Sequence, residues 1–468
     1  MKKIADMGIW VVLLIVLVFA YRLRMDGFAT TPFPGESTDE YSNAWVGMSL
    51  IGLGYPIGVG GLPTYPKHDF RYMNVDRIFS SNTVMGNATP LDYPWFDHPP
   101  MMGVVTGGFA YLKGARVFED ASTVIIRKPV IWVGMISLVL IFWLGKVALG
   151  PLSGLLAVVM MTFSPLMIMN ARMVQAENFI VPLFLAAVLA LYYYLGKGWR
   201  NGLYLAAACA GVGLLFKLSA VAIVLAVVLL ILTDEKKLKE KIRDVFIFLL
   251  IASGFLSMYF VIGLVYDWPL FLKTILGNTN RNYGIGFHSI FELLTITKIT
   301  GKIYLTDGWP LFGWLGVAYL FTSKLKRAKY ILIPLISYLC IYIFFGSESF
   351  GWYRIPVFPF VYLAGAYLLS RGINKAKTVI PAILFLLIPM GVGLEKLAGV
   401  DKLDMPTNWW RMGVPAVLLL ITVIFYSGKS RLAKNISKTI AMLMFLLALW
   451  ISYRYIGIID ANYWFRVN

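Results

Sequence analysis

Long apolar runs separated by short polar connections dominate this chain. After the basic start Met1–Lys3, the first apolar run extends to Tyr21. The others fall near 129–149, 153–169, 178–195, 202–216, 218–233, 245–265, 309–323, 330–346, 355–370, 378–394, 412–427 and 438–456. A helix of about 20 apolar residues crosses the bilayer core with its backbone hydrogen bonds satisfied. The pattern therefore predicts an all-α polytopic membrane protein with about thirteen transmembrane helices.

The runs on either side of Lys217 test this assignment. Read as one helix, 202–233 would be about 48 Å long, against a bilayer core of about 30 Å. It would place Lys217 at mid-membrane and the basic segment Lys236–Arg243 on the wrong side. We therefore expect two short helices that meet at Lys217.

The distribution of basic residues sets the predicted orientation. Lysine and arginine crowd into short connections such as Ser323–Lys329 and Lys429–Lys438. Short basic connections are typical of the cytoplasmic side. The pattern predicts a cytoplasmic N-terminus, an extracytoplasmic C-terminus and residence in a plasma or inner membrane.

Two predicted outer loops are much longer than the other connections. They span 22–128 and 266–308. The first is expected to carry surface helices over Tyr41–Leu53, lying on the bilayer, and Met101–Leu112. Long ordered loops tend to carry function, so the active site is expected on the extracytoplasmic side.

Composition narrows the class of protein. Of 468 residues, 59% are hydrophobic and 14% charged, which excludes a soluble enzyme, a disordered chain and a coiled coil. The apolar residues come in blocks rather than in alternation, which excludes a transmembrane β-barrel. The net charge of +18 follows from the basic inner loops, so no nucleic-acid partner is expected. Two cysteines cannot build a disulfide or metal framework.

Acidic residues concentrate in the outer loops. Asp39 and Glu40 stand soon after the first span and directly before the predicted helix Tyr41–Leu53. Such residues favour a helix start, where they cap or complement the helix dipole. The alternative is a carboxylate that acts as a general base.

Two further outer motifs contain ionisable residues. In Phe96-Asp97-His98-Pro99-Pro100, His98 is either a structural hydrogen-bonder or a group that binds phosphate or orients a base. At the junction near 170–178, Arg172 and Glu177 either pair with each other or contribute separately, since arginine binds phosphate as a planar fork.

Three more cations stand at predicted outer span ends: Arg127, Lys217 and Arg354. Snorkelling to lipid headgroups is one interpretation. A carboxylate near clustered lysine and arginine also suits group transfer from a lipid phosphate. The cations would stabilise the departing phosphate, and the carboxylate would take a proton from the attacking nucleophile.

The order of these motifs resembles the GT-C superfamily of polyprenyl-phosphate-sugar glycosyltransferases. It is most similar to the branch of protein O-mannosyltransferases and lipid A aminoarabinose transferases. The resemblance covers residues 1–370 as a catalytic module, whereas 371–468 carry further helices without a recognised motif. It implies an enzyme of inverting type that transfers a monosaccharide from a polyprenyl-phosphate donor to a hydroxyl group of a lipid, glycan or protein.

The resemblance also assigns roles to individual residues. Asp39 matches the acidic residue that acts as base or orients the acceptor, and Glu40 its acidic companion. Lys217, Arg172, Arg354, Arg127 and His98 are expected to bind the donor phosphate, and Asp97 and Glu177 to contact the acceptor or a metal. The family more often has aspartate at position 177, so a requirement for a divalent metal stays open.

Two other functions stay open at this stage. A lipid-linked glycan transporter or flippase would need ionisable groups and broken helices at mid-membrane, which most of the spans lack. An oligosaccharide transferase or polymerase with a diphosphate donor shares the outer cations, and the sequence separates it poorly.

Overall fold

The computed structural model describes residues 2–32, 39–59, 65, 69–72, 88–279, 287–295, 298–299, 307–345, 350–374, 416 and 430–462. The predicted spans 378–394 and 412–427 lie outside this set except for residue 416. The total of thirteen spans therefore stays a prediction.

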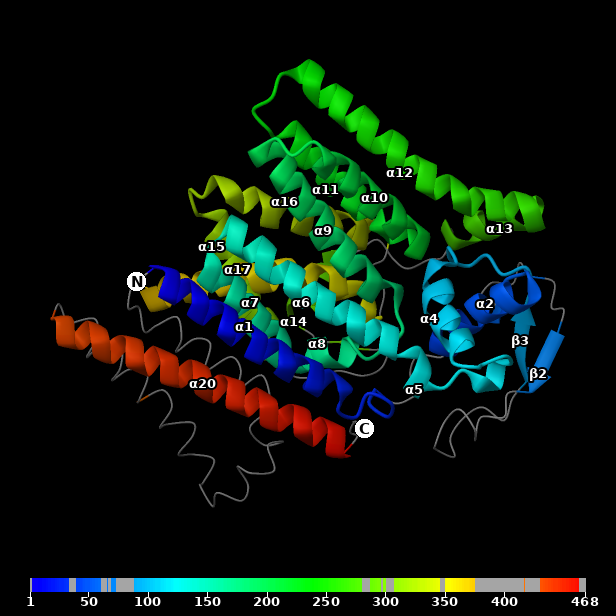
Figure 1. Cartoon of the computed structure of the whole chain (residues 1–468). Helices are drawn as coiled ribbons and strands as arrows, with labels where there is room; N and C mark the ends of the chain where they lie inside the picture. Colours follow the sequence, from blue (N-terminus) through cyan, green and yellow to red (C-terminus); the bar gives the residue numbers. More distant parts are fainter. Residues whose placement is uncertain are drawn as a thin grey trace.

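A bundle of apolar helices forms most of the molecule (Figure 1). Its helices are α1 (Lys2–Met25), α6 (Lys128–Ala148), α7 (Pro151–Phe163), α9 (Ala176–Lys197), α10 (Asn201–Phe216), α11 (Val221–Leu232), α12 (Leu238–Tyr266), α15 (Gly308–Phe321), α16 (Lys329–Phe345), α17 (Phe358–Asn374) and α20 (Arg431–Asn462). Within the described ranges, seven helices are long and apolar enough to cross a membrane, and several shorter apolar helices accompany them. The predicted all-α polytopic membrane fold is confirmed.

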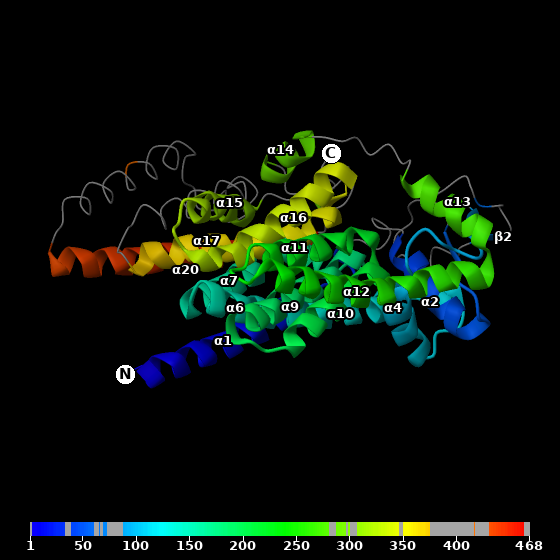
Figure 2. The ribbon, with the colours of Figure 1, turned by 90° about the horizontal axis from the view of Figure 1, so that it is seen from above.

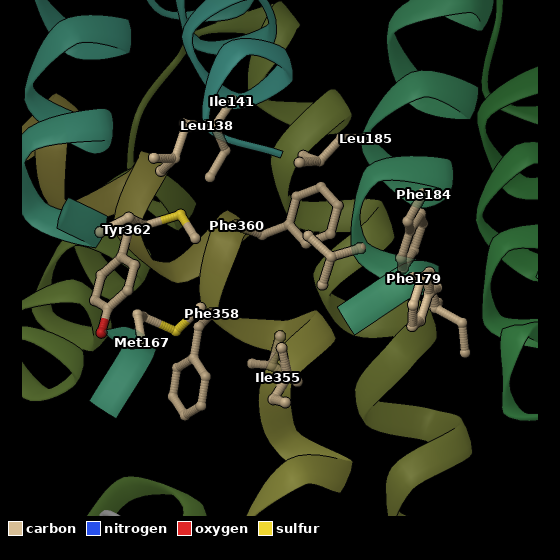
Figure 3. Packing of buried hydrophobic residues seen from close by; sticks show 14 of the residues in the cluster. Leu138, Ile141, Met167, Phe179, Phe184, Leu185, Ile355, Phe358, Phe360 and Tyr362 are labelled. Atoms are coloured by element: carbon tan, nitrogen blue, oxygen red, sulfur yellow. The ribbon is translucent and has the colours of Figure 1, made fainter. Parts of the chain in front are cut away.

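The core of the bundle lies where α6, α9 and α17 meet. Leu138 of α6, Phe184 of α9 and Phe360 of α17 converge there, and all three are buried (Figure 3). The rings of Phe184 and Phe360 pack edge to face with centroids 5.0 Å apart. Among the seven long apolar helices, the segment Gly351–Ile373, which includes most of α17, is the most enclosed, and α12 at the periphery is the least enclosed. The apolar surface of α12 is thus left for lipid.

A small subdomain stands at one end of the bundle, beyond the short helix α5 (Thr123–Ile126) (Figure 1). It contains α2 (Asp39–Leu53), α4 (Met101–Leu112) and the strands β1 (Gly58–Val59), β2 (Asp69–Tyr72) and β3 (Ala88–Asp92). The antiparallel sheet has the order β1-β3-β2, with Gly58 opposite Asp92 and Phe70 opposite Pro90. This sheet is not predicted by the sequence pattern, whereas both helices begin and end close to their predicted positions.

Helices α2 and α4 pack backbone against backbone. A Cβ atom at Gly47 would collide with the carbonyl oxygen of Gly103, and one at Gly107 with that of Ala44. This close approach buries Ala44, Trp45 and Met48 in the protein. The prediction that the apolar side of α2 lies on the bilayer is therefore wrong, because α4 covers it.

Two breaks in the predicted spans shape the bundle end next to the subdomain. The chain is extended at Lys217, between α10 and the 3-10 turn η2 (Leu218–Ala220) that leads into α11, as expected. The predicted span 153–169 is instead divided into α7 and α8 (Pro165–Asn170). Asp307 stabilises the chain at this second break. Its carboxylate accepts hydrogen bonds from the amides of Leu166 at the start of α8 and Trp309 at the start of α15.

Helix α20 packs on the outside of the bundle against α7, α8 and α17. The indole Nε1 of Trp309 donates a hydrogen bond of 3.0 Å to the Ser452 hydroxyl, which holds α20 to α15. The beginning of α1 and the end of α20 lie at opposite ends of the bundle (Figure 1). Figure 2 shows the same arrangement from above, with α12 and α13 (Trp268–Thr279) extending over the subdomain.

The backbone contact between α2 and α4 predicts unequal effects of two neighbouring substitutions. Gly107→Ala should lower the free energy of unfolding by about 1–3 kcal/mol, the usual cost of overpacking. At Gly108 the nearest atom to a new Cβ is the flexible Cδ1 tip of Ile51, 3.3 Å away, so Gly108→Ala should be tolerated. Thermal unfolding followed by tryptophan fluorescence measures both. Equal melting temperatures for the two variants would contradict the predicted backbone contact.

Candidate functional site

Glu40 and Arg127 form a buried ion pair at the junction of the bundle and the subdomain. Both side chains are almost completely inaccessible, at 1% and 0% exposure. The guanidinium binds the carboxylate through two hydrogen bonds, Nε to Oε2 at 2.8 Å and Nη2 to Oε1 at 2.7 Å. A bidentate pair of this kind fixes direction as well as distance.

Further hydrogen bonds extend this pair into the surrounding chain. Arg127 Nη1 donates to the carbonyls of Phe28 and Pro32, each at 2.8 Å. Glu40 Oε2 also accepts from the amide of Val174 at 3.0 Å. The pair therefore ties the start of α2 to the chain after α1 and to the turn before α9. Neither residue is accessible to a lipid phosphate in this arrangement.

A second ion pair joins Lys217 to Glu177. The ammonium of Lys217 lies 2.5 Å from Glu177 Oε1 and 4.1 Å from the centre of the Tyr353 ring. Lys217 reaches these partners because the chain is extended between α10 and η2, and Glu177 is in the first turn of α9. The Lys217 side chain is 16% exposed, whereas Glu177 is buried. Lys217 is therefore mostly enclosed by the protein but keeps some contact with solvent.

Asp39 is exposed and acts electrostatically on Lys217. It is the first residue of α2 and precedes the buried Glu40. Its charge is one of those that favour the protonated ammonium of Lys217. Since Glu40 anchors the start of α2, it also fixes the backbone position of Asp39. The structure thus separates the two acidic neighbours into a buried anchor and an exposed carboxylate.

Arg354 joins the same cluster through Tyr353. It lies in the 3-10 turn η4 (Gly351–Val357), and its Nη2 binds Glu292 Oε2 at 2.7 Å. Its Nε donates to the Tyr342 hydroxyl at 3.2 Å. The adjacent Tyr353 places its ring against Lys217, and its carbonyl accepts from Tyr338 at 2.9 Å. Glu292, on α14 (Phe287–Thr295), is a site neighbour that the sequence did not reveal.

Arg172 is buried and turned toward the C-terminal helix. Its Nη1 lies 2.5 Å from Asp460 Oδ1, and its Nη2 lies 3.0 Å from Asp460 Oδ2. Of the two alternatives for Arg172 and Glu177, pairing with each other is wrong, since Glu177 binds Lys217 instead. The sequence offered one signal for Asp460: an acidic residue near the end of an apolar span needs a partner.

Asp97 and His98 lie in a different set of contacts. The Asp97 carbonyl accepts from Asn278 Nδ2 on α13 at 3.0 Å, and burial together with the Asp97 charge raises the pKa of Tyr65. His98 is half-buried and packs edge to face on Trp95. Among the residues that the structure describes, no group of three or more His, Cys, Asp and Glu side chains could hold a metal.

The cluster combines three chemical capacities. Lys217 and Arg354 can bind a phosphate, since ammonium and guanidinium groups both donate charged hydrogen bonds to it. Their present partners, Glu177 and Glu292, hold these cations in place. Asp39 offers an accessible carboxylate that can accept a proton.

Comparisons with known proteins show which families and folds this chain is similar to. Residues 97–262 match the family model of the dolichyl-phosphate-mannose-protein mannosyltransferases. The chain is similar to ArnT from Cupriavidus metallidurans bound to undecaprenyl phosphate, with 16% identity and a TM-score of 0.50 over 97% of this chain and 76% of that one. It is also similar to the oligosaccharyltransferase AglB from Archaeoglobus fulgidus in complex with an inhibitory peptide and a dolichol-phosphate, with 13% identity and a TM-score of 0.54.

The AglB alignment covers 98% of this chain and 56% of AglB, so the chain spans little more than half of that protein. The curated protein sequences gave no match. The family match and the two structures confirm the resemblance on which the sequence analysis relied. The chain is thus a polytopic membrane protein with the fold of ArnT and AglB, similar over residues 97–262 to the dolichyl-phosphate-mannose-protein mannosyltransferases.

Proposed function

We propose that this protein is a membrane glycosyltransferase that moves a monosaccharide from a polyprenyl-phosphate donor to a hydroxyl acceptor, with inversion at the sugar carbon. The observation that carries the proposal is the enclosed Lys217, held between Glu177 and the Tyr353 ring, with Arg354 next to Tyr353 in η4. Asp39, exposed at the start of α2, adds an accessible carboxylate. ArnT and AglB, which share the fold, were solved with undecaprenyl phosphate and dolichol-phosphate, respectively. These lipids support a phosphate-bearing donor here.

The donor phosphate would bind where Lys217 and Arg354 now contact carboxylates. The donor is a phosphodiester with one negative charge, and further charge develops on its phosphate as the sugar leaves, so both cations match the departing phosphate best while Glu177 and Glu292 remain nearby. The ammonium and guanidinium then stabilise the charge that develops on the departing phosphate. An enclosed lysine serves this purpose better than a solvated one, because its field is less screened.

Asp39 would take the proton of the acceptor. As the acceptor oxygen bonds to the sugar carbon, the bond from that carbon to the phosphate oxygen breaks. The electron pair leaves with the phosphate, and the acceptor proton passes to the Asp39 carboxylate. Glu40 is assigned a positioning role instead, because its two oxygens are already engaged by Arg127 and Val174.

The proposed orientation follows the charge pattern. The basic connection around Lys236 lies at the other end of α11 from Lys217, so a cytoplasmic Lys236 places the site outside. The acceptor would then be a lipid, glycan or protein hydroxyl on the extracytoplasmic side.

Incubation with a panel of radiolabelled polyprenyl-phosphate sugars and one diphosphate-linked glycan, followed by separation of lipid, glycan and protein, tests donor and acceptor together. Transfer from the diphosphate donor alone would overturn the proposal.

Asp39→Asn should keep the fold and remove the base. We expect unchanged thermal stability, retained donor binding and a fall in turnover of about 10²-fold or more, within the range for general-base loss. Glu40→Gln is the matched comparison. Because it breaks a buried ion pair, it should lower stability by about 3–5 kcal/mol. Thermal unfolding and transfer rates measured on both variants separate the two roles. A fully active Asp39→Asn enzyme would remove Asp39 from the mechanism.

Lys217→Met should express and insert but transfer slowly. Loss of a charge aimed at the leaving phosphate lowers kcat by about 10²–10³-fold. Lys217→Arg should retain part of the activity, since the charge remains while its shape changes. Lys434 on α20 is a control in a predicted inner connection, and Lys434→Met should behave as wild type. Near-normal transfer by Lys217→Met would show that this lysine serves only the fold.

A further inference from the structure

We propose that Asp460, on the C-terminal helix α20, is a positioning residue for the site. It would act through Arg172 on the turn that presents Glu177 and the Val174 amide. The inference rests on the proposed function for its effect on turnover, but not for its effect on the turn. Residues 371–468 carried no recognised motif in the sequence, so this would be the first role for that part of the chain.

Arg172 is completely buried and held from three sides. Asp460 binds both terminal nitrogens of its guanidinium, the Leu23 carbonyl at the end of α1 accepts from Nη2 at 2.6 Å, and the Thr31 carbonyl accepts from Nη1 at 3.3 Å. Gly27, with a φ of +64°, allows the chain after α1 to pass close to Asp460. Of the three partners, Asp460 alone carries a charge.

A second buried arginine makes the Asp460 charge more important. Arg24 lies close enough to Arg172 to repel it electrostatically. The Arg24 guanidinium donates hydrogen bonds to two neutral carbonyls, that of Ala20 at 3.1 Å and that of Met161 at 3.4 Å. Asp460, bonded to Arg172, is therefore the carboxylate that, among the contacts of the described residues, offsets the charge of these two neighbouring arginines. A buried cation that loses its counter-charge is strongly destabilised where it stands, so Arg172 would have to move.

Movement of Arg172 would be transmitted through a stiff turn. The Asn178 side chain stabilises this turn, because its Nδ2 donates hydrogen bonds to the carbonyls of Asn170 at 2.8 Å and Met173 at 2.9 Å. Within the same few residues, the Val174 amide binds Glu40 and Glu177 binds Lys217. A displaced Arg172 would thus disturb both the anchor of α2 and the partner of the phosphate-binding lysine.

Helix α20 has attachments that do not need Asp460. Ser452 accepts the hydrogen bond from Trp309, and Ala448, Ile456 and Ile459 are buried against the bundle. Loss of the Asp460 charge should therefore leave α20 docked. This separates a positioning role, which depends on the charge, from simple attachment of the helix.

The test compares four variants of the full-length protein in nanodiscs. Asp460→Asn removes the charge with little change of shape, and Asp460→Glu restores it. Ser452→Ala weakens the docking of α20 elsewhere. Asp26→Asn is the matched control. Asp26 directly follows α1, near the Leu23 carbonyl that binds Arg172, but its carboxylate is in an exposed pair with Arg22. The measurements are hydrogen exchange in a peptide covering 170–178 and the kcat and KM of transfer.

We expect Asp460→Asn to speed exchange in 170–178 by about tenfold. It should lower kcat by about 10–100-fold with a smaller change in KM, the usual effect of misplacing catalytic groups. Asp460→Glu should recover most of both, and Ser452→Ala and Asp26→Asn should change neither by more than about twofold. Unchanged exchange and kcat in Asp460→Asn would overturn the proposal. So would an equal effect of Ser452→Ala, because α20 docking alone would then explain the result. Faster exchange in a protein without any transfer activity would leave Asp460 as the holder of the turn and refute the glycosyltransferase proposal instead.

Discussion

The buried pair of Glu40 and Arg127 is the interaction on which the junction between the bundle and the subdomain depends. Removing two charges from water costs several kcal/mol per ion, and only complete hydrogen bonding offsets this. Here the guanidinium makes four hydrogen bonds and the carboxylate accepts three. Such a pair tolerates little displacement, so α2 can begin in only one place. Asp39 gains a fixed position without being buried itself, which a reactive carboxylate requires.

The same principle recurs in the other cations of this region. Lys217, Arg172 and Arg354 each pair with a carboxylate from a different element: Glu177, Asp460 and Glu292. Each pair joins segments that are far apart in the sequence, and together they connect α9, α14, α20 and η4 around one end of the bundle. Charges that would be a liability near a bilayer thereby order the loops that carry the site.

Features governed by local sequence were predictable, and pairings between distant segments were not. The lengths of the apolar runs predicted the helices of the bundle. Pro99 and Pro100 stand directly before α4, and an apolar run too long for one span predicted the break at Lys217. Spacing instead favoured Arg172 with Glu177, five positions away, whereas the actual partner lies 288 positions away. Only the assembled bundle brings these residues together. The small sheet escaped prediction because strands of two to five residues carry too little pattern.

The short apolar helices of the bundle also bear on the thickness of the surrounding bilayer. Helices α7, α11 and α15 have 13, 12 and 14 residues, or about 18–21 Å each, well short of a hydrocarbon core of about 30 Å. Hydrophobic mismatch of this size favours local thinning of the lipid. In the proposed orientation, the outer leaflet would dip toward the break at Lys217. A lipid-borne phosphate would then reach the lysine while its prenyl tail stays in hydrocarbon, so membrane thickness itself becomes a determinant of substrate access.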